Sequence, residues 1–505
     1  MLDDVKRARE VSTAAWEAEV PKLRLELVEL QRRLRETAAF PVVILVSGIN
    51  CAGRSETVNL LNEWLDPRFL LTEAYWEPSP EERSRPPFWR YWRDLPPAGR
   101  IGIYMHAWYT QPMVRRFNGK LGRRAFLGHL ERAAAFESTL AADGALILKL
   151  WLHLDRDRQE TRLRALADDP LQRWRVAPMD WELSRHWGRF ATLAEEALRR
   201  TSTDAAPWHL VDGADDRWRS LAVARLVRDR LRERLDGQPA VAAPAALDLP
   251  PGEKQATRSA LDELDMTRSA SEKDYRRRLA ELQARVNRLA RLAREEELPV
   301  VAVFEGWDAS GKGGAVRRLT AAMDARDFRV VPITAPTGEE RAHHYLWRFW
   351  RHLSRAGRMT LFDRSWYGRV LVERVEGFAT EAEWRRAYGE IRDFESQLTE
   401  FGVVLLKFWL HVTDAEQLRR FEARRDTPYK SWKLTDEDWR NRAKRGAYEA
   451  AVAEMVARTS TGSAPWTLVE GDCKRFARLK VLETVADALD DALAGSPRRR
   501  KKGRG

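Results

Sequence analysis

Short apolar runs alternate along this chain with longer stretches of helical periodicity. Apolar residues at a spacing of about 3.6 predict a long helix from Tyr275 to Leu292. In the second half of the sequence, the runs expected to form buried strands are Val300–Phe304, Phe328–Ile333, Met359–Phe362, Val403–Leu410 and Trp466–Val469. This alternation predicts βαβ units, in which helices cover a parallel sheet and ligands lie at the carboxyl ends of the strands.

The same pattern occurs twice. The run PVVILVSG at Pro41–Gly48 returns as PVVAVFEG at Pro299–Gly306, and KLWLH at Lys149–His153 returns as KFWLH at Lys407–His411. Each pair is separated by 258 residues, a constant offset that chance does not produce. We infer a tandem duplication and expect two α/β domains, each with a parallel five-stranded sheet covered by helices.

Composition suggests where the domains begin and end. Residues 237–252 are rich in Ala, Pro and Gly, which is typical of a linker. We therefore expect an N-terminal domain over residues 1–236, a C-terminal domain over 253–495 and a basic disordered tail over 496–505. Two cysteines are too few for a disulfide framework. Because the chain lacks a membrane-spanning apolar run and Met1–Arg9 lacks the apolar core of a signal peptide, we expect a cytoplasmic protein.

The net positive charge of the chain favours anionic partners. Lys and Arg number 88 against 76 Asp and Glu, which gives a net charge of +12. A basic surface attracts nucleic acid, anionic lipid or another phosphate polymer, and composition does not choose among these.

A glycine-rich loop follows the strand at Val300–Phe304. The sequence GWDASGKG from Gly306 fits the spacing G-x-x-x-x-G-K between a strand and a helix. In such a P-loop, backbone N–H groups and the helix N-terminus hold phosphate oxygens, and the lysine adds a positive charge. The residues expected to contact phosphate are Gly306, Ser310, Gly311, Lys312, Gly313 and Gly314. The alternative is a glycine-rich turn with a surface lysine.

One position departs from the usual loop. Gly313 follows Lys312 where a Ser or Thr hydroxyl normally binds Mg²⁺. Two aspartates are candidates to hold the metal instead: Asp308 inside the loop, and Asp363 at the end of a strand. Either could be a cap or turn residue. The next residue, Arg364, is a candidate to neutralise the transferring group, with a plain ion pair as the alternative.

Basic residues concentrate between Arg419 and Lys433. Phosphate transferases place arginines on a mobile lid that brings positive charge to the transition state. Arg424 and Arg425 are therefore candidates to contact the transferring group, and Lys430 and Lys433 to contact phosphates. A solvated basic helix face is the alternative.

A candidate acceptor site follows another predicted strand. Glu339 and Glu340 lie in the segment PTGEE, where they could hold a nucleotide. The same pattern also fits a helix N-cap with acidic residues in its first turn. The residues alone leave both interpretations open.

Three segments together resemble the family-2 polyphosphate kinases. They are GWDASGKGG at 306–314, FDRSWYG at 362–368 and DTPYKSWK at 426–433. The resemblance covers the whole second half, and the duplication makes the chain similar to the fused two-domain branch, the polyphosphate:AMP phosphotransferases. It implies two tandem P-loop kinase-like domains with helical lids, and Mg²⁺-dependent transfer of the terminal phosphoryl of inorganic polyphosphate to AMP, giving ADP.

The resemblance also implies roles for individual residues. Asp308 and Asp363 would serve the metal and the acceptor phosphate, and Lys312 the phosphates. Arg364 and the lid arginines would serve the transferring group. A polyphosphate chain needs a basic channel, and the residues that would line it are Lys430, Lys433, Lys444 and Arg445.

The first half has lost these groups. At the offset of 258 residues, the counterparts are Asn50 for Asp308, Arg54 for Lys312, Met105 for Asp363 and His106 for Arg364. Methionine does not bind Mg²⁺, so we expect a catalytically silent, structural N-terminal domain and a catalytic C-terminal one. A regulatory polyphosphate site at Arg54 is the alternative.

Three other functions remain open. A polyphosphate-dependent kinase of ADP or GDP differs only in its acceptor. A nucleoside monophosphate kinase that uses ATP shares the P-loop, and a non-enzymatic polyanion-binding scaffold fits the net charge. We expect no nucleic acid substrate and no membrane partner, and the sequence is compatible with a homo-oligomer.

Overall fold

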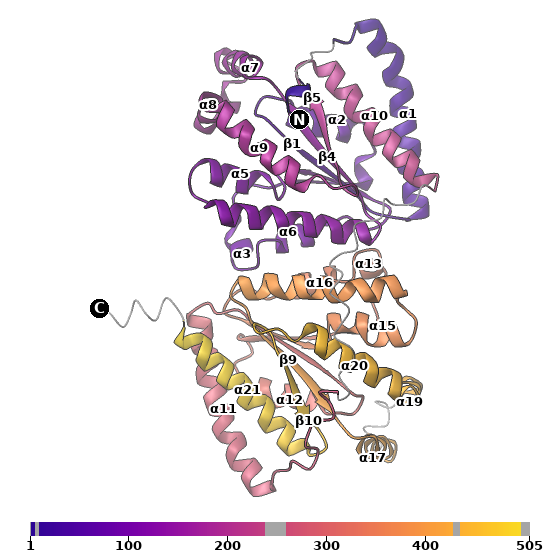
Figure 1. Ribbon diagram of the computed structural model, residues 1–505, viewed down its shortest axis with the longest axis vertical. Coiled ribbons are helices and arrows are strands. Elements are labelled where there is room, and N and C mark those ends of the chain that lie inside the picture. The colour runs from indigo at the N-terminus through magenta and orange to yellow at the C-terminus, as the bar shows by residue number, and fades with distance from the viewer. Residues whose placement is uncertain (1, 6–9, 238–258, 428–434, 496–505) are drawn as a thin grey trace, which may run out of the picture. The chain divides into compact units, whose positions relative to one another are not determined.

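The computed structural model describes residues 2–5, 10–237, 259–427 and 435–495, which form two compact units (Figure 1). Each unit contains one five-stranded sheet. All pairings between the strands of a sheet are parallel. The predicted α/β class, with two tandem parallel sheets covered by helices, is confirmed.

Unit 2 carries the strands predicted for the second half. They are β6 Val300–Gly306, β7 Phe328–Pro332, β8 Met359–Asp363, β9 Val404–His411 and β10 Trp466–Glu470. Their order across the sheet is β10-β9-β6-β8-β7, so β6 is central. Because parallel strands end at one edge of a sheet, the loops that follow the neighbours β6 and β8 meet at that edge.

Unit 1 repeats this topology. Its strands are β1 Val42–Gly48, β2 Leu70–Ala74, β3 Ile101–Met105, β4 Leu146–His153 and β5 Trp208–Asp212. The order β2-β3-β1-β4-β5 matches that of unit 2 strand for strand. The duplication read from the sequence is therefore a duplication of the fold.

Helices surround both sheets. The described helices of the first half are η1 Leu2–Val5, α1 Thr13–Thr37, α2 Arg54–Trp64, η2 Pro67–Phe69, α3 Pro80–Arg83, α4 Trp89–Arg93, α5 Thr110–Phe117, α6 Arg123–Ala142, α7 Arg156–Asp168, η3 Arg173–Arg175, α8 Pro178–Arg185, α9 Trp187–Thr201 and α10 Asp216–Leu235. Those of the second half are α11 Glu272–Glu295, α12 Lys312–Thr320, α13 Gly338–Arg341, α14 Trp347–His352, η4 Trp366–Val370, α15 Val372–Val375, α16 Glu381–Glu400, α17 Asp414–Arg425, α19 Asp436–Ala443, α20 Arg445–Thr459 and α21 Lys474–Ala494. Among these helices, none has the length and apolar character needed to cross a bilayer.

The core of unit 2 lies on both faces of its sheet. Apolar side chains of α11, α12 and α21 pack on one face, and Figure 1 shows α11 beside α21. On the other face, the ring of Phe394 in α16 lies 4.8 Å from those of Trp350 and Trp366. The long helix predicted from Tyr275 to Leu292 falls within α11.

The two units are not contiguous in the sequence. Unit 2 includes residues 79–89 of the first half, and unit 1 includes residues 337–344 of the second half. The predicted domains, 1–236 and 253–495, are contiguous and therefore differ from these units by the exchange of two equivalent segments. The predicted linker from residue 238 onwards and the predicted basic tail lie outside the described residues.

Hydrogen bonds to backbone carbonyl oxygens hold each exchanged segment in its unit. In unit 2, Trp89 Nε1 donates to the carbonyl oxygen of Trp350 at 2.9 Å. In unit 1, the amide of Ala98 donates to the carbonyl oxygen of Ala342 at 2.7 Å. Composition could not reveal this exchange, because it depends on tertiary contacts rather than on the character of the linker.

Lys407 of β9 places a charge in the interior of unit 2. Its Nζ donates to Glu395 Oε2 at 2.7 Å and to the carbonyl oxygen of Thr459 at 2.7 Å. Trp366 Nε1 and the Tyr367 hydroxyl donate to Glu395 Oε1 at 3.0 and 2.6 Å. Since these two aromatic residues begin η4, the cluster fixes the chain just after β8. Unit 1 repeats it with Lys149, Glu137, Thr201, Trp108 and Tyr109.

Removing one partner of this buried pair should strongly destabilise unit 2. We expect Lys407→Met to cost about 3–5 kcal/mol, because it leaves the Glu395 carboxylate buried without its counter-charge. Hydrogen exchange of the β9 amides measures the loss in unit 2 alone. The double variant Lys407→Met/Glu395→Gln should recover most of the stability, because it removes both charges and keeps an oxygen that accepts from Trp366 and Tyr367. A single variant that lost less than about 1 kcal/mol would contradict the assignment of this pair as a main support.

Candidate functional site

The predicted P-loop connects β6 to α12 in unit 2. Gly306 has φ of +146°, and a Cβ there would lie 2.4 Å from the carbonyl oxygen of Leu410 in β9, so only glycine fits. Ala309 and Gly311 also have positive φ, +63° and +112°. The helix begins at Lys312, which gives the strand–loop–helix arrangement that cradles phosphate. The hydroxyl of Ser310 is buried in this loop without a hydrogen-bond partner among the described residues.

Lys312 folds back over the loop. Its Nζ donates to the carbonyl oxygens of Gly306 at 2.6 Å and of Trp307 at 3.2 Å. Burial lowers the pKa of the ammonium group, and the charge of Asp308 acts in the opposite direction. The cation is thus held by neutral carbonyls that a phosphate oxygen can replace.

Asp308 receives partners from two other elements. Arg364 Nη2 donates to Asp308 Oδ1 at 3.1 Å, and Asn441 Nδ2 of α19 donates to Oδ2 at 3.0 Å. Burial would raise the pKa of this carboxyl, but Lys312 and Arg364 outweigh burial and hold the pKa below its usual value. Asp308 is therefore a carboxylate at neutral pH, with one positive and one neutral donor on it.

Asp363 ends β8 directly beside the loop. It pairs with Phe304 across the sheet, and a Cβ built on Gly313 would lie 4.0 Å from Asp363 Oδ2. The next residue, Arg364, has φ of +65°, and its amide donates to the carbonyl oxygen of Phe304 at 3.0 Å. The structure thus brings together Asp308, Lys312, Asp363 and Arg364, as the sequence predicted.

Glu305 is a site residue that the sequence analysis missed. It is buried in β6 directly before Gly306, and its Oε1 accepts from the Ser365 hydroxyl at 2.8 Å. Burial raises its pKa, although the charge of Lys312 opposes this. The sequence could have indicated this residue, since a glutamate inside an apolar strand needs a hydrogen-bonding or charged partner. The first half has Ser47 and Ala107 at the two positions.

The helices α17 and α19 border the loop. Arg420 of α17 donates to the carbonyl oxygens of Ala309 and Ser310, both at 2.9 Å. Gln417 Nε2 donates to the carbonyl oxygen of Asp308 at 3.2 Å. These contacts, like that of Asn441, depend on tertiary packing, and sequence spacing did not reveal them.

The predicted lid arginines lie one turn beyond these contacts. Arg424 and Arg425 occupy the last turn of α17, and Arg425 Nε donates to Asp426 Oδ1 at 3.2 Å. The structure does not bring them onto the loop, so their contact with the transferring group stays a prediction. Lys430 and Lys433 lie outside the described residues.

The predicted acceptor residues form a helix cap. Thr337 and Glu340 make a capping box at the start of α13, and Glu339 lies in its first turn. Segment 337–344 belongs to unit 1, whereas the P-loop belongs to unit 2. Glu340 therefore fits the alternative interpretation, a helix N-cap. Contact of Glu339 and Glu340 with a nucleotide stays a prediction.

A small cavity of about 80 Å³ opens beside the loop. Asp308, Arg364 and Glu437 line its polar side. Its apolar side is formed by Trp307, Leu371, Val372, Trp409 and Tyr448. The site therefore offers charged groups and a largely aromatic wall within one concave surface.

The carboxylates present fit a magnesium ion held together with substrate. Among the described residues, no group of three or more His, Cys, Asp or Glu side chains could hold a metal by itself. Mg²⁺, however, is commonly held by one or two carboxylates plus substrate phosphates. Asp308 and Asp363 supply two such carboxylates, whose oxygen atoms are hard donors.

Unit 1 keeps the shape of the loop but not its charges. Gly48, Cys51 and Gly53 have positive φ of +154°, +66° and +90°, close to the values at the equivalent positions of unit 2. Burial, together with Arg54, lowers the pKa of His106 to about 4. His106 is therefore uncharged at neutral pH, where its counterpart Arg364 carries a charge.

Three polar side chains of unit 1 form a chain of hydrogen bonds at the loop. Arg54 Nη2 donates to Asn50 Oδ1 at 2.8 Å, and Asn50 Nδ2 donates to Asp180 Oδ1 at 2.6 Å. The surrounding cavity of about 520 Å³ has equal numbers of cationic and acidic residues in its lining. They are Arg54, Arg162, Arg175 and Arg219 with Glu56, Asp169, Asp180 and Asp216. Such a lining has no excess charge to attract a polyanion.

Comparison with known proteins agrees with this geometry. The chain matches the family Polyphosphate kinase 2 (PPK2) twice, over residues 10–238 and 269–497. It is 48% identical over 498 residues to a protein of Pseudomonas aeruginosa named polyphosphate:AMP phosphotransferase, covering 97% of this chain and 99% of that protein. A protein of the same name from Pseudomonas syringae pv. tomato is 45% identical over 494 residues, covering 98% of this chain and 99% of that protein.

A solved structure shares the fold over the full length. A crystal structure described as a polyphosphate kinase 2 from Pseudomonas aeruginosa PA01 superposes with a TM-score of 0.88 at 45% identity, covering 98% of this chain and 100% of that chain. The two family matches coincide with the two halves that the internal repeat defines. This chain therefore belongs to the polyphosphate kinase 2 family and contains two copies of the family's domain.

Proposed function

We propose that this chain transfers the terminal phosphoryl group of inorganic polyphosphate to AMP, giving ADP, and that unit 2 carries out the reaction. The observation that carries the proposal is the convergence of Lys312, Asp308, Asp363 and Arg364 on one P-loop in unit 2. Relatives 48% and 45% identical over nearly the whole chain are named polyphosphate:AMP phosphotransferase, which supports both the donor and the acceptor.

In the proposed reaction, an oxygen of the AMP phosphate attacks the terminal phosphorus of polyphosphate. A new P–O bond forms, the bond to the bridging oxygen breaks, and a chain shortened by one phosphate leaves. The attacking phosphate is ionised near neutral pH, because its second pKa is about 6, so no strong base is required. Alignment and neutralisation of charge then supply most of the rate.

The cations of unit 2 supply that neutralisation. Lys312 leaves the loop carbonyls and binds the transferring phosphate, and Arg364 exchanges its bond with Asp308 for a phosphate oxygen. Arg424 and Arg425 extend the positive charge when α17 moves inward. We assign Lys430 and Lys433 to the donor chain.

We propose that Asp308 and Asp363 hold Mg²⁺ together with substrate phosphates. Kinases of this kind generally use a divalent metal, which neutralises charge that develops on phosphate oxygens. The low pKa of Asp308 supports this role, because the carboxylate is ionised and its donors can be exchanged. Gly313 leaves open the position where a hydroxyl would otherwise reach the metal.

We further propose that unit 1 is catalytically silent. Its loop has no carboxylate at the positions of Asp308 and Asp363, and Arg54 already bonds Asn50. The balanced charges of its cavity also argue against a regulatory polyphosphate site there. Its contribution is structural, since it retains the sheet and the buried Lys149–Glu137 pair.

The first test is product analysis with matched variants of the two loops. The wild-type protein should form ADP from polyphosphate and AMP, and not from ATP and AMP. Lys312→Ala and Asp363→Asn should each lower kcat by at least about 100-fold, because each removes a charge from the reacting groups. The matched control, Arg54→Ala in unit 1, should stay within about twofold of wild type. Near-normal turnover by either unit 2 variant would refute the site, and ADP formed from ATP would refute the donor.

Metal removal tests the role of the two carboxylates. Treatment with EDTA should reduce ADP formation by at least about 100-fold, and added Mg²⁺ should restore it, because the phosphate charge is otherwise not neutralised. In the Asp363→Asn variant, the Mg²⁺ concentration for half-maximal rate should rise. Turnover that persisted in EDTA would exclude a required divalent ion.

The contact between α19 and Asp308 can be tested separately. Asn441→Leu introduces the residue found at the equivalent position of unit 1, Leu183, and removes a hydrogen bond to a charged group worth about 1.5–3 kcal/mol. We expect hydrogen exchange in α19 to rise about tenfold or more, with a lower rate of ADP formation. Asp436→Asn, an exposed residue in the first turn of α19, is the control and should change neither. Unchanged exchange in Asn441→Leu would show that this bond does not hold the helix.

A further inference from the structure

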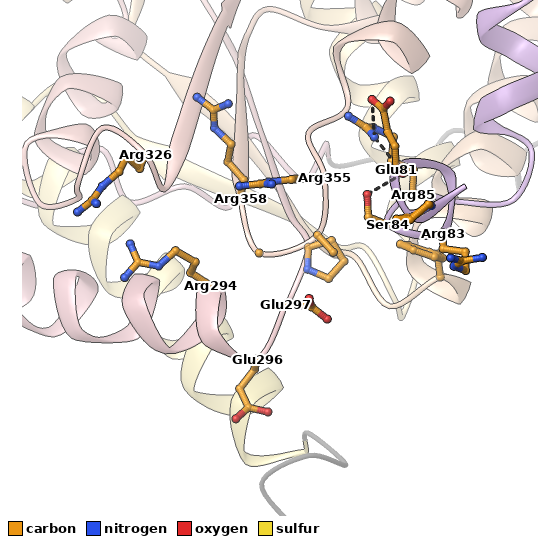
Figure 2. Close-up of a pocket in the computed structure, with 15 residues that line it drawn as sticks. Glu81, Arg83, Ser84, Arg85, Arg294, Glu296, Glu297, Arg326, Arg355 and Arg358 are labelled. Atoms are coloured by element: carbon orange, nitrogen blue, oxygen red, sulfur yellow. Dashed lines mark hydrogen bonds and ion pairs between the residues drawn. The ribbon is translucent and has the colours of Figure 1, made fainter. Parts of the chain in front are cut away.

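A second, larger cavity lies in unit 2 away from the P-loop. It has a volume of about 850 Å³ and is lined by the end of α11, by Arg326 before β7 and by residues 355–358 before β8 (Figure 2). The cavity therefore opens at the amino-terminal edge of the sheet, whereas Asp363 ends β8 at the opposite edge. The five residues of β8 separate the two by about 15 Å.

Arginines dominate this lining. It contains six arginines and three glutamates. Arg294, Arg326, Arg355 and Arg358 come from the body of the unit, and Figure 2 shows them around the same opening. The other two, Arg83 and Arg85, come from segment 79–89, which belongs to the same compact unit. We call this cavity the arginine pocket.

Two of the arginines keep an uncompensated charge. Arg358 donates from Nε and Nη2 to the carbonyl oxygen of Phe328, at 3.1 and 2.9 Å, so its partner is neutral. Arg355 is exposed. Within the part of the chain that the structure describes, neither side chain forms an ion pair with a carboxylate. Arg294 and Arg326 do form such pairs, with Asp327 at 2.7 Å and Asp324 at 2.8 Å.

The three glutamates of the lining offset only part of the charge of its six arginines. Glu81 pairs with Arg85 at 3.2 Å. Figure 2 shows Glu296 pointing away from the arginines, while Glu297 lies nearer to the opening. The pocket therefore keeps an excess of positive charge, which favours an anionic ligand.

The duplicated fold shows that two of these arginines, Arg294 and Arg355, are not needed for the scaffold. At the equivalent positions, unit 1 has Glu36 in place of Arg294 and Pro97 in place of Arg355. Glu36 pairs with Arg32 in the same helix at 2.8 Å. The same sheet thus folds with an acid and a proline at these two positions. Unit 1 keeps Arg68 and Arg100 at the positions of Arg326 and Arg358, so the full set of four arginines occurs in the unit that has the complete P-loop.

We propose that the arginine pocket binds a stretch of inorganic polyphosphate at the edge of the sheet opposite to the P-loop. The inference rests on the proposed function, which makes polyphosphate the donor. Guanidinium groups bind phosphate oxygens by paired hydrogen bonds, and a long chain offers a charge at every unit. Phe401 is the only aromatic side chain of the pocket lining, so the pocket suits a phosphate chain better than a base.

Such a site would hold long chains on the protein between transfers. Once one stretch is bound, the rest of the chain is at a high local concentration near the same unit. Chains too short to reach from one edge of the sheet to the other gain nothing from this effect. The pocket therefore distinguishes donors by length.

The test compares long-chain polyphosphate with tripolyphosphate in the double variant Arg326→Glu/Arg355→Glu. Both side chains are exposed, so the fold should be retained. We expect KM for long-chain polyphosphate to rise about tenfold at constant salt and kcat to stay unchanged. KM for tripolyphosphate should stay as in the wild type. Equilibrium binding of long-chain polyphosphate in the absence of AMP should weaken by about the same factor.

The control variant carries the same change of charge elsewhere. Arg68→Glu/Arg276→Glu alters the unit 1 counterpart of Arg326 and an exposed residue of α11, and should bind both donors as the wild type does. Equal KM and equal binding in the pocket and control variants would overturn the inference and leave the proposed function intact.

Two further outcomes are decisive. If wild-type protein forms no ADP from polyphosphate, the proposed function fails, and the binding measurement alone decides whether the pocket holds the polymer. If single-stranded RNA displaces polyphosphate at equal phosphate concentration and the pocket variant loses RNA equally, the pocket is a nucleic-acid site and the inference is wrong.

Discussion

The buried ion pair between Lys407 and Glu395 is the interaction on which the site depends. It joins β9 to α16 and, through Trp366 and Tyr367, to the turn that follows β8. That turn directly follows Asp363, whose position over the P-loop could not be held by a surface loop alone. A buried charge is stable only with all its partners in place, so the cluster tolerates one arrangement of these elements. This one arrangement also fixes the backbone that carries the carboxylate of Asp363.

The duplication separates what the scaffold requires from what the chemistry requires. Both units keep the buried pair, the strand order and the left-handed backbone of the loop. Unit 1 loses the carboxylates, and its remaining cations bond to neighbouring side chains. Because the shape survives without the charges, the loop conformation is a property of the fold. The charges of unit 2 at Asp308, Asp363 and Arg364 are additions that the fold does not need, since unit 1 has Asn50, Met105 and His106 at these positions.

The sequence pattern predicted those parts of the molecule that depend on local structure or on the parallel pairing of neighbouring strands. The five strands of unit 2, the loop at Gly306 and the adjacent position of Asp363 all follow from periodicity and from the parallel sheet. Asn441 and Gln417 could not be predicted, because their contacts with Asp308 depend on how two helices pack over the loop. Glu305 could have been found, since an acid inside an apolar strand is unusual. The exchanged segments left no trace in composition.

That exchange has a consequence for how the chain is made. Unit 1 contains residues 337–344, which are synthesised only after the linker and the first two strands of unit 2, β6 and β7. When the first half leaves the ribosome, segment 337–344, which belongs to unit 1, has not yet been synthesised. The residues of unit 2 that segment 79–89 contacts have not been synthesised either. Cutting the chain at the linker would separate each exchanged segment from the unit that it contacts. The fusion of the two domains is thus part of the fold itself.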